Sequence, residues 1–78
     1  MNKEMEKRVE KVLKTLSPRE EKVLILRWGI GGRDPISYEF ISEKFGVGRE
    51  RIRQIETKGL RKLRHPVRQK ILEDLLEP

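Results

Sequence analysis

The proline and glycine residues of this sequence divide it into short segments, and their positions most constrain how the chain can fold. The breaks fall at Ser17-Pro18, at residues 29–35, at residues 46–48 and at His65-Pro66. Between the breaks, apolar residues recur every three or four positions, as in an amphipathic helix, and no segment alternates as a strand does. The sequence therefore predicts an all-α fold, a compact bundle of about five short helices without a β-wing.

Start and stop signals predict the bounds of the first two helices. Five apolar residues share one helical face near the N-terminus: Met5, Val9, Val12, Leu13 and Leu16. They predict a helix from about residue 3 to residue 15. Ser17, Pro18 and Glu20 then supply an N-cap hydroxyl, a proline at the first helical position and a capping-box carboxylate. The second helix should run from Pro18 to Trp28 and end at Gly29, because glycine adopts a left-handed cap at least cost.

The remaining helices are predicted in the same way. Ser37 is an N-cap for a short helix from Tyr38 to Phe45. A longer helix from Arg49 to about Arg64 carries an inward stripe of Ile52, Ile55, Gly59, Leu60 and Leu63. The proline at position 66 ends this helix, since it disfavours a helical conformation at the residue before it. A final short amphipathic helix is marked by Val67, Ile71, Leu72 and Leu75.

Size and composition limit what the chain can do. Its 78 residues can build one modest core, so we expect a single domain over residues 1–78. Cysteine is absent, and the only histidine, His65, lacks companions for a metal site or a catalytic dyad. The glycines of residues 29–33 do not indicate a phosphate-binding loop, because no strand precedes them and no Gly-Lys-Ser or Gly-Lys-Thr is present. We expect a soluble, non-enzymatic, cytoplasmic protein with no cofactor, no metal and no membrane segment.

The charge of the chain is concentrated in one segment. The net charge is +6, yet residues 1–48 hold ten basic and eight acidic groups. Residues 49–70 hold nine basic and two acidic groups, and residues 71–78 hold three acidic groups and no basic one. A basic segment inside an otherwise balanced domain is typical of a surface that binds a polyanion. The alternative interpretation is a solvated helix face.

Two short helices meet across a glycine turn in residues 38–57. Seven positions there match the spacing of a helix-turn-helix: Ile41, Ser42, Phe45, Gly46, Val47, Ile52 and Ile55. The serine is small enough for close helix approach, and the glycine can adopt a backbone angle that other residues resist. An ordinary helical hairpin would not need both of these together with a basic second helix. We therefore interpret residues 38–57 as a helix-turn-helix.

The outward face of the second helix has the chemistry of DNA recognition. With Ile52 pointing inward, the wheel directs Glu50, Gln54, Thr57 and Arg61 outward, with Arg53 and Lys58 on the flanks and Arg49 at the start. Arginine can grip guanine, glutamine can pair with adenine, and glutamate can accept a hydrogen bond from cytosine. All three residue types lie in the first two turns, which reach base edges in the major groove when a helix-turn-helix docks.

The same residues resemble a known family. RERIRQIE at Arg49–Glu56 and LRKLRHP at Leu60–Pro66 resemble region 4.2 of primary sigma factors of the sigma-70 family. LSPRE at Leu16–Glu20 and LRWG at Leu26–Gly29 resemble region 4.1. The resemblance divides the chain into a region 4.1-like part (residues 16–36), a region 4.2-like helix-turn-helix (residues 37–66) and a C-terminal helix (residues 67–78).

The resemblance implies a function and a set of roles. It implies a bacterial, nucleoid-associated domain that binds the minus-35 element of double-stranded promoter DNA while docked on the β flap of core RNA polymerase. The implied base-reading residues are Arg49, Glu50, Gln54 and Arg53. The implied contacts to the DNA backbone are Arg19, Arg27, Tyr38, Glu39, Arg51 and Lys58. A surface for activators is implied at Lys58, Arg61 and Arg64, and anti-sigma factors or other regulators are further candidate partners.

The second helix has more apolar residues than one small core can easily bury. We expect a groove for the polymerase flap, lined by Leu26, Ile25, Trp28 and Ile30, because leftover apolar groups commonly mark a partner surface. The alternative is that Trp28 folds over Ile30 and completes the core.

Departures from the family pattern concern helix stability and docking rather than base reading. Gly48 stands where the family usually has threonine or serine, and Phe40 where a glutamate would complete a capping box. Ile25 and Trp28 also differ from the usual residues, and Gly59 replaces a common alanine at a cost of about 1 kcal/mol unless close packing offsets it.

Two other classes of protein remain open. A stand-alone helix-turn-helix regulator would need a dimer interface for its paired half-sites, and ultracentrifugation would distinguish it from the monomeric domain that we expect. A pure interaction module, such as an adaptor or anti-sigma domain, would not bind promoter duplex.

Overall fold

A computed structural model describes residues 3–70 of the chain, and these residues are helical except for turns and loops. The helices are α1 (Lys3–Leu13), α2 (Pro18–Trp28), α3 (Tyr38–Phe45) and α4 (Arg49–Leu63). Residues 66–70 are helical again, and no strand occurs within residues 3–70. The prediction of an all-α fold is therefore confirmed. Ile71, Leu72 and Leu75, which were expected in the final helix, lie outside the described residues, as does the side chain of Met5.

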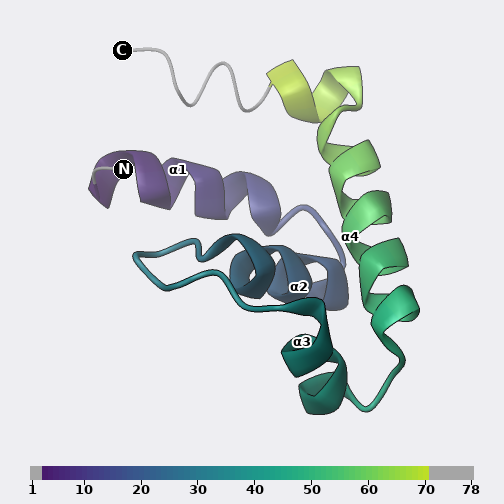
Figure 1. Cartoon of the computed structure of the whole chain (residues 1–78). Helices are drawn as coiled ribbons and strands as arrows, with labels where there is room; N and C mark the ends of the chain where they lie inside the picture. Colours follow the sequence, from purple (N-terminus) through teal and green to yellow (C-terminus); the bar gives the residue numbers. More distant parts are fainter. Residues whose placement is uncertain (1–2, 71–78) are drawn as a thin grey trace.

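The other three labelled helices are arranged around α2 (Figure 1). Helix α2 packs against both α3 and α4, and α3 packs against the start of α4. Helix α1 runs beside α2, and the loop of residues 29–37 returns along α2 before α3 begins. Only one side of α4 packs against the other helices, so its opposite side faces outward.

The predicted caps set most of the helix boundaries. Ser17 and Glu20 form a capping box at the start of α2, in which each side chain accepts a hydrogen bond from the other's backbone N–H. Gly29 ends α2 in the left-handed conformation, with φ 67°. Ser37 caps α3 by accepting a hydrogen bond from the Phe40 backbone N–H. The expected bounds of α2 and α3 are confirmed.

Helix α1 is two residues shorter than predicted, and the reason is local. The Thr15 backbone N–H donates to the Val12 carbonyl instead of the carbonyl four residues back, and the Thr15 hydroxyl donates to the same oxygen at 2.6 Å. This competing hydrogen bond tightens the chain into a turn after Leu13. Helix α4 ends at Leu63, with Arg64 as its C-cap, one residue before the predicted end.

The core consists of two hydrophobic clusters on different sides of α2. The first cluster joins α1, α2 and the following loop through Leu13, Leu16, Leu24 and Ile30. The second joins α2, α3 and α4 through Val23, Ile41, Ile52 and Ile55. Helix α2 contributes buried residues to both clusters, and Leu60 and Leu63 of α4 also pack against the first, so α2 and α4 together connect the N-terminal part to the helix-turn-helix.

Gly59 allows α4 to lie close to α2. A Cβ atom at this position would stand 3.2 Å from Leu24 Cδ1 and 3.6 Å from Glu20 Cβ. The close packing that could offset the poor helix propensity of glycine is therefore present. Within residues 3–70 no helix is long and apolar enough to cross a membrane.

Candidate nucleic-acid interface

The second cluster holds α3 and α4 in a fixed relation across the turn of residues 46–48. Ile41 and Ile52 are fully buried against each other's helices, and Phe45 and Val47 pack on the same cluster. Gly46 has φ 68°, and the Val47 backbone N–H donates to the Ser42 carbonyl at 3.2 Å, which closes α3. The residues that predicted the helix-turn-helix thus occupy the expected places.

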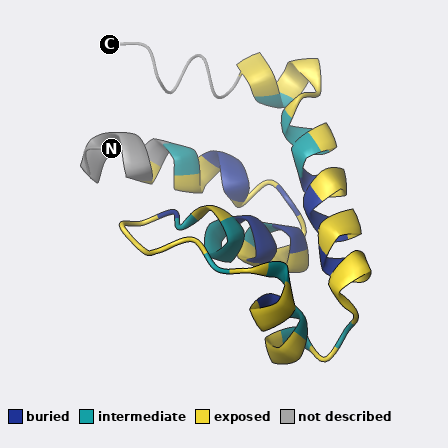
Figure 2. Ribbon diagram, viewed as in Figure 1, coloured by how far each residue is buried: buried dark blue, intermediate teal, exposed yellow. Residues whose placement is uncertain are grey.

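The outward side of α4 is a continuous polar surface. Figure 2 shows the side of α4 that faces α2 as buried and its outer side as exposed. A shallow depression on the outer side is lined by Glu50, Arg51, Arg53, Gln54, Thr57, Lys58 and Arg61. Arg49 is also exposed and lies at the first position of the helix. All four residues predicted to read bases therefore share the first two turns of one exposed helix face.

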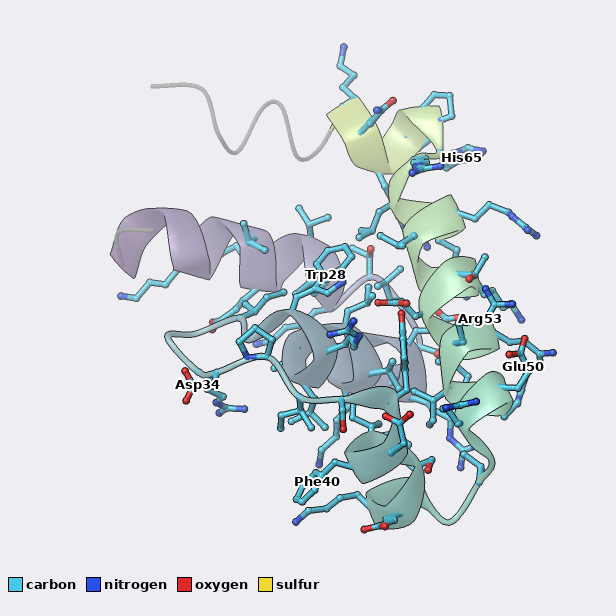
Figure 3. The ribbon with its side chains drawn as sticks, viewed as in Figure 1. Trp28, Asp34, Phe40, Glu50, Arg53 and His65 are labelled. Carbon is cyan, nitrogen blue, oxygen red and sulfur yellow. The ribbon has the colours of Figure 1, made fainter. Side chains whose placement is uncertain are left out.

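Both predicted base-reading arginines, Arg49 and Arg53, form exposed ion pairs. Arg49 Nη1 lies 2.8 Å from Glu39 Oε1, and Arg53 makes two hydrogen bonds to Glu50, at 3.1 and 2.8 Å. Figure 3 shows Glu50 and Arg53 together on the outer side of α4. The hydrogen bond from each arginine lowers the pKa of its partner carboxyl below the usual range, because it stabilises the carboxylate.

These ion pairs are weak enough to be exchanged. The side chains of Arg49 and Glu39 are 67% and 61% exposed, and exposed pairs gain little because water screens them. A phosphate or a guanine edge can therefore replace the carboxylate partner at small cost.

The residues predicted at the DNA backbone lie at three places in the structure. Arg27 and Tyr38 lie together, with the Arg27 guanidinium carbon 4.4 Å from the centre of the Tyr38 ring, and Glu39 follows at the start of α3. Arg51 and Lys58 are exposed on α4, and Arg19 is exposed in the first turn of α2. The structure thus brings Arg27, Tyr38, Glu39 and Arg49 into one neighbourhood, whereas Arg19 lies at the other end of α2 from Arg27.

The residues predicted at the activator surface lie on the C-terminal half of α4. Lys58, Arg61 and Arg64 are all exposed, and a second shallow depression is lined by Thr57, Leu60, Arg61 and Arg64. The position is suitable for an acidic partner, and the role stays a prediction.

Three of the four residues predicted to line one flap groove are divided between the two clusters, and Trp28 belongs to neither. Ile30 is buried in the first cluster and Ile25 packs against it, whereas Leu26 packs against the second cluster. Trp28 is 44% exposed and donates its indole N–H to Glu56. A separate depression of volume ≈ 370 Å³ between α2 and α3 is lined by Lys22, Leu26, Ile36, Phe40, Ile41, Lys44 and Phe45.

Sequence reasoning gave no role to Glu56, which the structure buries to 8% exposure on the inward side of α4. A signal was present, because Glu56 lies one turn after Ile52 and next to Ile55 on the inward stripe of α4. A carboxylate on the inward side of an amphipathic helix predicts hydrogen bonds from donors on another element, because a buried polar group is costly without a partner.

Comparison with known proteins agrees with this arrangement. Residues 12–65 match the family described as Sigma-70, region 4. The chain is 57% identical over 67 residues to the RNA polymerase sigma factor SigA of Clostridium acetobutylicum, which covers 86% of this chain and 18% of that protein. It is 53% identical over 73 residues to the SigA proteins of a Bacillus species and of Listeria monocytogenes, covering 94% of this chain and 19% and 20% of theirs.

The chain spans about a fifth of the length of these relatives. The family match nevertheless extends from the end of α1 through the whole of the helix-turn-helix. The match includes the whole of α2, α3 and α4 and more than half of the chain, and this chain belongs to the sigma-70 region 4 family.

Proposed function

We propose that this chain recognises the minus-35 element of bacterial promoters by inserting the start of α4 into the DNA major groove. The observation that carries the proposal is the exposed face of α4, on which Arg49, Glu50 and Gln54 lie within two turns while Ile52 and Ile55 anchor the opposite side. A rigid helix with base-reading side chains on its free side is what docking in the major groove requires.

Charge supports the same proposal. Nine basic groups and two acidic groups lie in residues 49–70, and one of those two acids, Glu56, is buried. The other, Glu50, is the single exposed acid of α4 and sits among the proposed base-reading residues. The outer side of α4 is therefore strongly cationic, which favours a polyanionic partner.

The test is an alanine series on promoter DNA. Arg49→Ala, Glu50→Ala and Gln54→Ala should each cost ~1–3 kcal/mol on the preferred minus-35 duplex and relax the preference at one base pair. Glu43→Ala, which removes an exposed glutamate of α3, serves as the control and should leave the preference unchanged. Equal losses on preferred and scrambled duplex for all three variants would exclude base reading by α4.

Docking on the RNA polymerase core is the second part of the proposal. The relatives are RNA polymerase sigma factors by name, which supports RNA polymerase as the partner and transcription initiation in a bacterial cytoplasm as the setting. The β flap as the docking partner is what the resemblance to region 4 implies. The exposed Trp28 indole, beside the partly buried Ile25, gives such a partner an apolar contact. We expect the isolated domain to be monomeric, and a stable dimer in ultracentrifugation would favour a stand-alone regulator instead.

A further inference from the structure

The carboxylate of Glu56 joins three helices at one buried point. The Tyr38 hydroxyl donates to Glu56 Oε1 at 2.6 Å, and the Trp28 indole N–H donates to Glu56 Oε2 at 3.1 Å. Trp28 is the last residue of α2, Tyr38 is the first of α3, and Glu56 lies in the middle of α4. Each carboxylate oxygen therefore holds the end of a different helix (Figure 3 labels Trp28).

Burying this carboxylate has a desolvation cost, because it is only 8% exposed. Among the described residues no lysine or arginine forms an ion pair with Glu56, so its two hydrogen bonds come from neutral donors, and Arg53 interacts with it only at longer range. An apolar side chain of similar size would avoid the desolvation cost at this position of the stripe. The role of Glu56 is therefore sought in the two side chains that donate to it, Trp28 and Tyr38.

The Tyr38 ring in turn supports Arg27. The Arg27 guanidinium lies over the ring at 4.4 Å, and its Nε atom is buried without a hydrogen-bond partner. The cation is thus held by stacking on a ring whose rotation is restrained by its own hydroxyl bond to Glu56. Stacking engages the flat face of the guanidinium and not its terminal N–H groups, and a pre-positioned guanidinium loses less entropy when those groups meet an oxyanion.

We infer that Glu56 is a positioning residue for DNA binding: through Tyr38 it holds the Arg27 guanidinium where a phosphate of the DNA backbone docks. The inference rests on the proposed function, since it assumes that Arg27 meets the DNA backbone. Glu56 itself touches no DNA, because it is buried beneath the face that it supports.

The experiment compares Tyr38→Phe, Glu56→Gln and Arg27→Ala in binding to promoter and scrambled duplexes over a range of salt concentrations. Arg27→Ala should lower the slope of log K against log salt by about one unit. Tyr38→Phe removes only the hydroxyl and should weaken both duplexes by about 3- to 10-fold, the value of one hydrogen bond. Glu56→Gln should do the same, because an amide can accept from only one of the two donors. Neither change should add to the loss in an Arg27→Ala background.

Two controls separate positioning from folding. Glu20→Gln alters the other buried carboxylate of the described chain, which hydrogen-bonds to Ser17 and Lys62, and it should leave the salt slope unchanged. Trp28 is the only tryptophan of the chain, so a change in its fluorescence emission in Glu56→Gln reports the altered hydrogen bond directly.

The outcomes are distinct. Folded Tyr38→Phe and Glu56→Gln variants with full affinity, beside a weakened Arg27→Ala, would refute positioning by Glu56 and leave the DNA-binding proposal intact. An Arg27→Ala variant with an unchanged salt slope would overturn the inference by itself. A native chain that bound promoter and scrambled duplex equally would overturn the proposed function instead.

Discussion

The Lys62 ammonium group of α4 lies 2.8 Å from Glu20 Oε1 of α2, and that same oxygen accepts the Ser17 backbone N–H at 3.1 Å. A local capping box and a tertiary ion pair therefore share one atom. The Glu20 side chain is only 6% exposed and that of Lys62 is 34% exposed, so the pair couples the start of α2 to the C-terminal half of α4 at the edge of the core.

This coupling predicts a dependence of stability on pH. Burial by itself would raise the pKa of Glu20, but the hydrogen bonds from Lys62 and Ser17 together hold it below the usual 4.5. Because the folded-state pKa is the lower one, the stabilisation is complete above the unfolded value and is lost as pH falls through the folded value. We expect Glu20→Gln to lower the free energy of unfolding by about 1–3 kcal/mol near neutral pH, with a smaller difference from the native chain in acid. Urea unfolding at both pH values measures this, and a difference that did not change with pH would contradict the ionic origin.

Serine substitutions at the two glycines of the turn, Gly46 and Gly48, should change the stability of the domain in opposite directions. Gly48 is the N-cap of α4 at φ −67°, offers no side-chain cap, and has open space where a Cβ would stand. Gly48→Ser should therefore stabilise the domain by about 0.5–1.5 kcal/mol, through a new cap and a less flexible unfolded chain.

Gly46 has equal space but a φ of 68°. Gly46→Ser should destabilise the domain by about 1 kcal/mol, because residues with a Cβ are strained in the left-handed region. Thermal unfolding of both variants decides the point. Changes of the same sign would mean that backbone conformation does not control this turn.

Lysines on different faces should differ in their effect on DNA binding. Lys58 lies on the outer side of α4, whereas Lys22 lines the depression between α2 and α3, and both are exposed. Lys58→Ala should weaken all duplexes similarly and reduce the salt slope by about one unit, while Lys22→Ala should leave it unchanged. Arg19→Ala should behave like Lys58→Ala if the first turn of α2 meets the backbone. Equal slopes for the native chain and Lys58→Ala, measured by fluorescence anisotropy, would place Lys58 off the DNA.

The two exposed aromatic residues provide a matched test of polymerase docking. Trp28 and Phe40 are 44% and 48% exposed, and they lie at the end of α2 and the start of α3. We expect Trp28→Ala to weaken binding of a β flap-tip peptide by about 10-fold or more, as for an aromatic anchor, and Phe40→Ala to have little effect. Circular dichroism confirms folding of both. A larger loss of peptide binding in Phe40→Ala than in Trp28→Ala would indicate that the peptide docks in the depression lined by Phe40.

Local signals in the sequence were sufficient for the bounds of α2 and α3 and for the outward face of α4. The Ser17 cap, the left-handed Gly29 and the glycine at position 46 act within a few residues, so their effect does not depend on the rest of the fold. The inward stripe through Ile52 and Ile55 orients α4, and its orientation decides which side chains point outward. The roles assigned to those side chains stay predictions.

Only the tertiary structure decided which distant groups meet. Ile25 and Leu26 are neighbours in sequence, yet they pack on different clusters because α2 is covered on two sides, so the expected four-residue groove is divided. The partners of Glu56 come from 28 and 18 residues away, and the Lys62 partner of Glu20 from 42. Helical periodicity shows which face of a helix is buried, but the angle at which two helices cross decides which polar groups come within hydrogen-bonding distance.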